Sequence, residues 1–329
     1  MGPGTTGRER LWVVCPSYTD VVAFTVLRER VLDVLQGAPA FCDRTIRFVL
    51  VDDTGGRDPR TDELRDFDDV SVIAPPFNLG HQRAIVFGLR LLEPEIADTD
   101  IVVTMDADGE DRPEDLPRLL EPLSANPDDR ACLCIARRTK RSESIRFRVM
   151  YFFFRILFRI LAGVTIRNGN FAAYRGWLAR RMLLHPYFDL CYSSTLVSLD
   201  IPVTPVPIPR GTRYAGKSRM NLFRLIMHGV RMLTPFTDRI AVRALTAFAA
   251  IFGLSVVLSV VVVGADVFTS ALVPGWTIAT LLGILVLSLN AVGTSVVLFA
   301  VFSHSRGISL AGLEERFDRG ARSTPSPAD

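Results

Sequence analysis

Residues 101–110 read IVVTMDADGE, a short apolar run followed by acids. The apolar residues predict a buried strand, and the sequence PED at 113–115 is typical of a helix start. Asp106 and Asp108 therefore fall where a strand ends, which is where open α/β sheets bind ligands. Their spacing of two residues sends both carboxylates to one side of an extended chain.

The two aspartates predict a metal site. Carboxylate oxygens at a strand end suit Mg²⁺ or Mn²⁺ that carries substrate phosphates. The alternative is an acidic turn that only caps the next helix. We favour the metal because other segments of the chain converge on the same predicted edge of the sheet.

Strands and helices are expected to alternate over the first part of the chain. Apolar runs predict strands at 11–15, 48–51, 70–73, 101–103 and 132–135. The helical spacing of apolar residues predicts helices at 22–35, at 82–92 and up to about Leu123. This alternation implies a mostly parallel sheet with helices on both faces. Asp52, Asp53 and Asn78 follow strands, so we expect them at the same edge as the aspartate pair.

Composition narrows the class of protein. The chain of 329 residues has 49% hydrophobic residues and a formal net charge of +3. So small a charge does not indicate a nucleic-acid-binding protein. The five cysteines have neither disulfide nor zinc spacing, and reduced thiols are expected.

Two segments, 147–161 and 221–236, combine large apolar residues with arginines. They are too short and too charged to span a bilayer. Each is either a core helix or a helix that lies in the membrane interface, and we favour the interface because the two segments look alike. A basic loop at 213–219, RYAGKSR, lies between them and suits phosphate binding, as does the arginine cluster at 137–141.

Two long apolar runs, 244–263 and 277–302, are each long enough to cross a bilayer core of ~30 Å. The alternative, a buried hairpin of a soluble protein, is disfavoured by uncharged runs of this length. Arginines flank the pair, whereas the connection at 265–275 has neither Lys nor Arg. This asymmetry predicts a multi-pass protein of the inner (plasma) membrane with both termini in the cytoplasm.

An ordered set of short motifs resembles those of the family 2 glycosyltransferases, and in particular of the polyprenyl-phosphate glycosyltransferases. The resemblance extends from about residue 11 to 302. The matching elements are VCPSYTD at 14–20, VDDTG at 51–55, NLG at 78–80 with Ala84 and Gly88, DAD at 106–108, Arg138 with Arg141, GNF at 169–171, RYAGKSR at 213–219 and VPGWT at 273–277.

The resemblance implies a GT-A type, Rossmann-like α/β fold with a mostly parallel sheet, interfacial amphipathic helices and two C-terminal transmembrane helices. It implies an inverting, Mg²⁺- or Mn²⁺-dependent transfer of a sugar from a nucleoside diphosphate sugar to a polyprenyl phosphate. The nucleotide-sugar residues would be Pro16, Tyr18, Asp20, Asp52, Asp53, Asn78, Gly80 and Asp106. The acceptor-phosphate residues would be Arg138, Arg141, Arg213, Lys217 and Ser218. The metal ligands would be Asp106, Asp108 and Glu110, and the catalytic set Asp106, Asp108, Arg138 and Arg213.

The expected organisation has five parts. These are a polar segment at 1–10, a catalytic domain at 11–220, a juxtamembrane segment at 221–243, a membrane hairpin at 244–303 and a partly disordered cytoplasmic tail at 304–329. The chain departs from the family pattern at several positions, among them Asp20 for Glu and Asn170 for Asp. Two alternatives stay open: a membrane-anchored glycosyltransferase with a glycan or other non-prenyl acceptor, and an inactive nucleotide-sugar-binding scaffold. Homo-oligomer formation also stays open.

Overall fold

The computed structural model describes residues 9–126, 132–138, 145–164, 168–199, 201–214, 222–269 and 275–304. The chain forms two compact units. The first comprises Met1–Tyr151 and Ile166–Pro235, and the second comprises Phe152–Thr165 and Phe236–Asp329.

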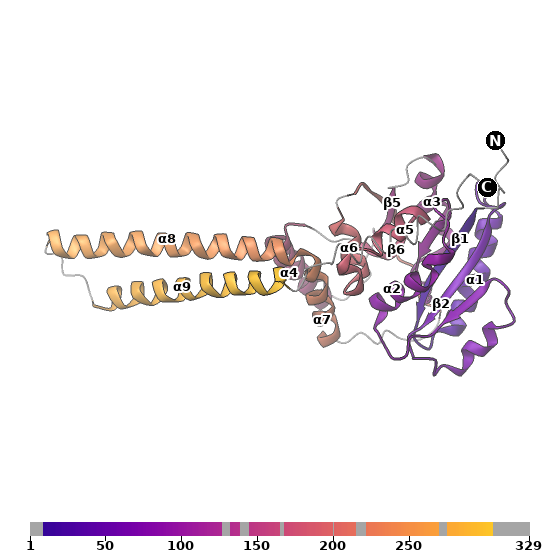
Figure 1. The fold of residues 1–329 in the computed structure, drawn as a ribbon, viewed down its shortest axis with the longest axis horizontal. Coiled ribbons are helices and arrows are strands. Elements are labelled where there is room, and N and C mark those ends of the chain that lie inside the picture. The colour runs from indigo at the N-terminus through magenta and orange to yellow at the C-terminus, as the bar shows by residue number, and fades with distance from the viewer. Residues whose placement is uncertain are drawn as a thin grey trace, which may run out of the picture. The chain divides into compact units, whose positions relative to one another are not determined.

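The first unit is built on a seven-stranded sheet with the strand order β3-β2-β1-β4-β6-β5-β7 (Figure 1). The strands are β1 (Arg10–Ser17), β2 (Thr45–Asp52), β3 (Val70–Ile73), β4 (Ile101–Thr104), β5 (Leu133–Arg138), β6 (Asn168–Arg175) and β7 (Val203–Ile208). β6 runs antiparallel to both β4 and β5, and the other neighbouring strands are parallel. The mostly parallel α/β sheet expected from the sequence is therefore confirmed.

Helices cover both faces of this sheet, as predicted. They are α1 (Val21–Gln36), α2 (His81–Leu92), α3 (Leu116–Ala125), α5 (Gly176–Met182) and α6 (Tyr192–Ser198). Helix α7 (Leu222–Leu233) contacts α6. Short 3₁₀ turns lie at Pro59–Leu64, Glu93–Glu95, Pro113–Asp115, Pro186–Asp189 and Thr234–Phe236.

Alternating strand residues supply two separate cores. Val13 and Phe48 pack with residues of α1 and α3, whereas Val14 and Val51 pack with residues of α2, α5 and α6. The Phe24 and Phe48 rings meet edge to face at 6.1 Å. Complete burial of one such side chain is worth about 1.5–3 kcal/mol, so these cores hold the strand ends in fixed positions.

Helix α2 lies unusually close to β2. A Cβ atom at Gly88 would stand 2.5 Å from Cγ2 of Val51, so a larger residue there would push the helix off the sheet. This close packing fixes the first turn of α2, and with it His81 and Gln82, beside the strand ends.

The second unit contains α4 (Ile145–Ala162) from Phe152 onward, together with α8 (Thr237–Thr269) and α9 (Gly275–His304). Helices α8 and α9 pack against each other, and the Oγ atoms of Ser255 and Ser288 are buried 3.5 Å apart between them. Two candidate membrane spans, Met227–Ala265 and Gly275–Leu298, have only 6% and 11% of their most apolar windows buried. By length and composition, both helices could cross a membrane.

Helix α4 presents an apolar face. Phe152, Ile156, Leu157 and Ile160 are all exposed and recur at helical spacing. Arg243 of α8 donates to the backbone carbonyl of Ile160 over 2.9 Å, which satisfies an end of α4. The predicted catalytic domain, 11–220, included this helix, whereas from Phe152 onward it groups with α8 and α9.

Candidate active site

The carboxyl ends of three neighbouring parallel strands define one edge of the sheet. Ser17 at the end of β1 lies opposite Asp52 at the end of β2, and the N–H of Asp53 donates to the carbonyl of Ser17 over 2.9 Å. On the other side of β1, the N–H of Met105 after β4 donates to the carbonyl of Val14 over 3.2 Å. The segments after these strands are thereby held next to one another, as the sequence predicted.

Asp53 holds the loop that precedes α2. Its carboxylate accepts the N–H groups of Leu79 and Gly80 over 2.6 and 2.9 Å, and the Asn78 side chain donates to its backbone carbonyl over 3.1 Å. Burial raises the pKa of Asp53, and the two backbone donors oppose that increase. Asp53, Asn78 and Gly80 thus shape the rim of the site.

Asp52 differs from its neighbour. One of its oxygens, Oδ1, accepts the N–H of Thr54 over 3.0 Å, whereas Oδ2 is buried without a hydrogen-bond partner in the described part of the chain. An unsatisfied buried carboxylate oxygen is costly. A ligand N–H that reached it would remove that cost.

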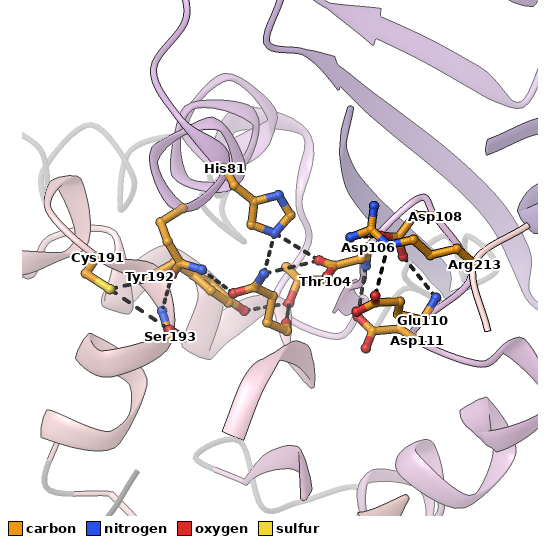
Figure 2. A network of polar contacts seen from close by, with 12 residues as sticks. His81, Thr104, Asp106, Asp108, Glu110, Asp111, Cys191, Tyr192, Ser193 and Arg213 are labelled. Carbon is orange, nitrogen blue, oxygen red and sulfur yellow. Dashed lines mark hydrogen bonds and ion pairs between the residues drawn. The ribbon is translucent and has the colours of Figure 1, made fainter. Parts of the chain in front are cut away.

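The acids after β4 form a connected polar cluster, which Figure 2 shows from close by. Oδ1 of Asp106 lies 2.9 Å from Nε2 of His81. Oδ1 of Asp108 accepts the N–H of Glu110 over 2.9 Å. Asp111 accepts the N–H of Asp106 through Oδ2 over 2.9 Å, and its Oδ1 lies 3.3 Å from Nη2 of Arg138. Arg138, at the end of β5, therefore contacts the acids that follow the aspartate pair, and its role in phosphate binding stays a prediction.

Two carboxyl groups of the cluster have raised pKa values. Burial and the neighbouring Asp106 carboxylate raise the pKa of Asp108 to about 6, and the same two causes raise the pKa of Asp111 to about 7. Burial also acts to raise the pKa of Asp106, but contacts with His81, Arg138 and Asn170 keep it below its usual value. Such a site favours an additional cation.

The loop at 209–214 docks onto the turn that carries the two aspartates. The N–H groups of Gly211 and Tyr214 donate to the carbonyls of Glu110 and Asp108 over 2.9 and 2.8 Å. A Cβ atom at Gly109, whose φ is +89°, would stand 2.7 Å from the Tyr214 ring. Only glycine fits this turn while the loop is docked.

Two arginines of this loop pair with the acids. Nη2 of Arg213 lies 2.9 Å from Oδ2 of Asp108, and its Nε donates to Oε1 of Glu110 over 2.9 Å. Nε of Arg210 donates to Oε2 of Glu110 over 3.1 Å. Both oxygens of Glu110 are thus engaged by arginine, and its role as a third metal ligand stays a prediction.

Asp106 and Asp108 fit a divalent cation as a partial ligand set. Within the described ranges, no group of three or more His, Cys, Asp or Glu side chains has the arrangement of a complete metal site. Mg²⁺ is commonly held by one or two carboxylates together with substrate phosphates and water. The carboxylates of Asp106 and Asp108 meet that requirement.

The other predicted residues fall in three places. Pro16 pairs with Val51 in the sheet, and Tyr18 is 42% exposed at the edge. Asp20 precedes the first turn of α1 and its charge acts on Arg213. Arg141, Lys217 and Ser218 lie outside the described residues.

Several members of the cluster were not predicted from the sequence. These are His81, Gln82, Asp111, Asn170 as a contributor, and Arg210. A usable signal existed for His81 and Gln82, because they follow the NLG element directly and the first turn of a helix after a strand-end loop faces the ligand edge. The place of Asn170 in the cluster depends on the pairing of β6 with β4, which the sequence pattern does not reveal.

A comparison with known protein families identifies the family to which the chain belongs. The sequence model described as glycosyl transferase family 2 matches residues 12–188, which is more than half of the chain. No curated protein sequence matched. The protein is a glycosyltransferase with a GT-A-like fold. It belongs to glycosyl transferase family 2.

The chain is also similar to solved structures, at low sequence identity and with TM-scores below 0.5. Glucosyl-3-phosphoglycerate synthase from Mycobacterium tuberculosis, in complex with Mn²⁺, uridine diphosphate and glucosyl-3-phosphoglycerate, is 20% identical, with a TM-score of 0.46 over 73% of this chain and 85% of that chain. S. aureus TarS 1–349 in complex with UDP is 14% identical, with a TM-score of 0.41 over 72% of this chain and 65% of that chain.

Proposed function

We propose that this enzyme transfers a sugar from a nucleoside diphosphate sugar to a polyprenyl phosphate at the cytoplasmic face of the plasma membrane, with inversion at the anomeric carbon. The observation that carries the acceptor class is the exposed apolar surface of the second unit. It comprises the apolar face of α4 and the two candidate spans. Apolar surface of this extent is typical of a contact with a membrane or with another protein. It supports an acceptor whose prenyl tail lies in the membrane.

The donor would bind at the strand edge. The unpaired Oδ2 of Asp52 is an acceptor for an N–H of a nucleobase, and both uracil and guanine carry such a group. Pro16, Tyr18 and Asp20 lie on the adjacent β1 edge and would line the nucleoside. Asp53, Asn78 and Gly80 keep that rim in place through their hydrogen bonds.

Asp106 and Asp108 would hold Mg²⁺ or Mn²⁺ together with the donor diphosphate. The bound cation would supply charge neutralisation for the diphosphate leaving group. Arg138 pairs with Asp111 and Arg213 pairs with Asp108, and both arginines would reduce repulsion between the donor and acceptor phosphates. We keep Lys217, Ser218 and Arg141 as proposed acceptor contacts from the sequence.

The chemistry needs no strong general base. A phosphate monoester is already ionised at neutral pH, so its oxygen can attack the anomeric carbon directly. The new bond joins that oxygen to the anomeric carbon, and the bond from the anomeric carbon to the donor's β-phosphate oxygen breaks. The nucleoside diphosphate leaves with the electron pair, and attack from the opposite side inverts the configuration.

A donor panel tests the proposal. Purified enzyme in vesicles is given radiolabelled UDP- and GDP-sugars, with and without added polyprenyl phosphate, and label is counted after organic extraction. We expect extractable label from one donor class only, and only when the prenyl phosphate is present. Label in a non-extractable glycan would favour the membrane-anchored enzyme with a non-prenyl acceptor. No transfer from any donor would contradict the proposal.

A further inference from the structure

Gln82 connects the start of α6 with the aspartate cluster. Its side-chain Oε1 accepts the backbone N–H of Ser193 over 2.8 Å and lies 3.6 Å from Sγ of Cys191. Figure 2 shows Ser193 and Cys191 on the opposite side of the network from Asp108. Since a backbone N–H can only donate, the carbonyl oxygen of the Gln82 amide must face Ser193. Its NH₂ group therefore points away from α6.

Asn170 receives that NH₂ group. Nε2 of Gln82 donates to Oδ1 of Asn170 in a short hydrogen bond. The amide of Asn170 is thereby fixed in turn, and its Nδ2 faces Oδ1 of Asp106 at 3.1 Å. The orientation of two amides, which is ordinarily ambiguous, follows here from a single backbone donor.

We call the chain of hydrogen bonds from Ser193 through Gln82 and Asn170 to Asp106 the relay. Contacts outside the relay hold the backbone of Asn170. Its carbonyl accepts the Thr104 hydroxyl over 2.6 Å, and Thr104 lies 2.7 Å from the hydroxyl of Tyr192. Asn170 is also buried, with 7% of its surface exposed. The backbone of Asn170 is therefore fixed, and its side-chain amide can only rotate. Gln82 determines that Nδ2 rather than Oδ1 of this amide faces Asp106.

The relay determines which oxygen of Asp106 is free for a ligand. Oδ1 contacts both His81 and Asn170, and His81 Nε2 also contacts Nδ2 of Asn170. No hydrogen bond to Oδ2 of Asp106 occurs among the residues that the structure describes. The carboxylate is thus held by one oxygen and presents the other.

We propose that Gln82 is a positioning residue for this glycosyltransferase. It holds the Asn170 amide with its N–H toward Asp106, and so presents Oδ2 of Asp106 to the divalent cation. This inference rests on the proposed role of Asp106 as a metal ligand. It makes Gln82 important for metal affinity although the side chain touches neither metal nor substrate.

The neutral substitution Gln82→Met isolates this effect, because it keeps the length of the side chain and adds no charge. Without the Gln82 donor, the Asn170 amide is no longer held in one orientation, and its hydrogen bond to Asp106 is formed less often. We expect Mn²⁺ binding, measured by electron paramagnetic resonance of the free ion, to weaken by about tenfold, as for the loss of one hydrogen bond to a charged group. Turnover should recover at saturating Mn²⁺. A merely structural role would lower the melting temperature and leave the Mn²⁺ affinity unchanged.

A double-mutant cycle tests the route through Asn170. Asn170→Ala should weaken Mn²⁺ binding by a similar factor, and Gln82→Met should have no further effect in that background. The matched control is Gln36→Met at the exposed end of α1, which should bind Mn²⁺ like the unchanged protein. If Gln82→Met does not fold, Gln82→Ala replaces it, because water can then reach the Ser193 N–H.

The outcomes separate this inference from the proposed function. Additive losses in the double variant, or unchanged Mn²⁺ binding by Gln82→Met, would overturn the role of Gln82 while leaving the metal site intact. Unchanged binding by Asp106→Asn would instead remove the metal role of Asp106, and both proposals would fall together.

Discussion

Nη2 of Arg213 lies 2.9 Å from Oδ2 of Asp108, one of the two carboxylates that we propose as ligands of the divalent cation. The guanidinium is held there by Glu110 and by the docking of its loop onto the aspartate turn. If Asp108 is a metal ligand, we expect Arg213 and the divalent cation to compete for it. Displacement by the cation would leave Arg213 available to a phosphate.

This competition predicts opposite effects of Arg213→Ala on metal binding and on transfer. Mn²⁺ binding should tighten by up to about fivefold, because a partly exposed ion pair is worth at most about 1 kcal/mol. Sugar transfer should slow by about tenfold to hundredfold, the loss expected for one charge-assisted phosphate contact made in the transition state. Both are measured on one preparation, with Mn²⁺ titration and steady-state transfer.

Arg319→Ala is the control for general surface charge, since Arg319 follows the predicted spans. It should change neither quantity, whereas attraction to anionic lipid would make the two variants alike. Equal small losses of transfer in both would show that Arg213 is an ordinary interfacial charge.

Asp108→Ala should abolish transfer without destabilising the fold. The pKa of Asp108 is raised to about 6, chiefly by burial and by Asp106, so at pH 7 its charged form disfavours the metal-free folded state. Removing the carboxylate should leave the melting temperature in EDTA unchanged or higher. EDTA should likewise stop transfer by the unchanged enzyme, and Mg²⁺ or Mn²⁺ should restore it. Full activity in EDTA would refute the metal assignment.

Gly109→Ala should impair transfer through the docked loop. The new Cβ atom would meet the Tyr214 ring at 2.7 Å and would hold a non-glycine residue at φ +89°, a strain of about 1–3 kcal/mol. We expect at least tenfold slower transfer and faster proteolysis of the loop at 209–214. Gly283→Ala in α9 is the matched control, because nothing lies within 4 Å of its Cβ position. Normal transfer by Gly109→Ala would show that loop docking is not needed for activity.

The proposed topology predicts where reporters appear. A reporter at Thr269, the last residue of α8, should be found outside, and one at Asp329 should be cytoplasmic. Accessibility of an introduced cysteine to an impermeant reagent provides the measurement. A cytoplasmic Thr269 would mean that α8 does not cross the membrane.

The local pattern of the sequence was sufficient where one strand or helix carries its own signal. The apolar runs before Asp52 and Asp106 predicted β2 and β4, and parallel pairing brought their ends together. Strand β7 was not predicted, because Pro205 and Pro207 lack the N–H that an interior strand needs, and both are tolerated at this edge of the sheet.

The contact between Gln82 and Asn170 could not be predicted from the sequence, for a different reason. The two residues are 88 positions apart and meet only because β6 inserts antiparallel beside β4. That register puts Ala172 opposite Thr104 and so brings Asn170 to the strand end. No periodicity in the sequence encodes such a crossing.

A doubly labelled donor tests whether the enzyme transfers the sugar alone to the polyprenyl phosphate. The nucleoside diphosphate sugar carries ¹⁴C in the sugar and ³²P in the β-phosphate, and the enzyme acts on vesicles that contain polyprenyl phosphate. We predict that ¹⁴C enters the organic extract while ³²P stays in the aqueous phase with the nucleoside diphosphate. The Asp108→Ala variant should transfer neither label. Entry of both labels into the lipid would show sugar-phosphate transfer, and ¹⁴C that never depends on added prenyl phosphate would exclude that acceptor. Either result would contradict the proposed reaction.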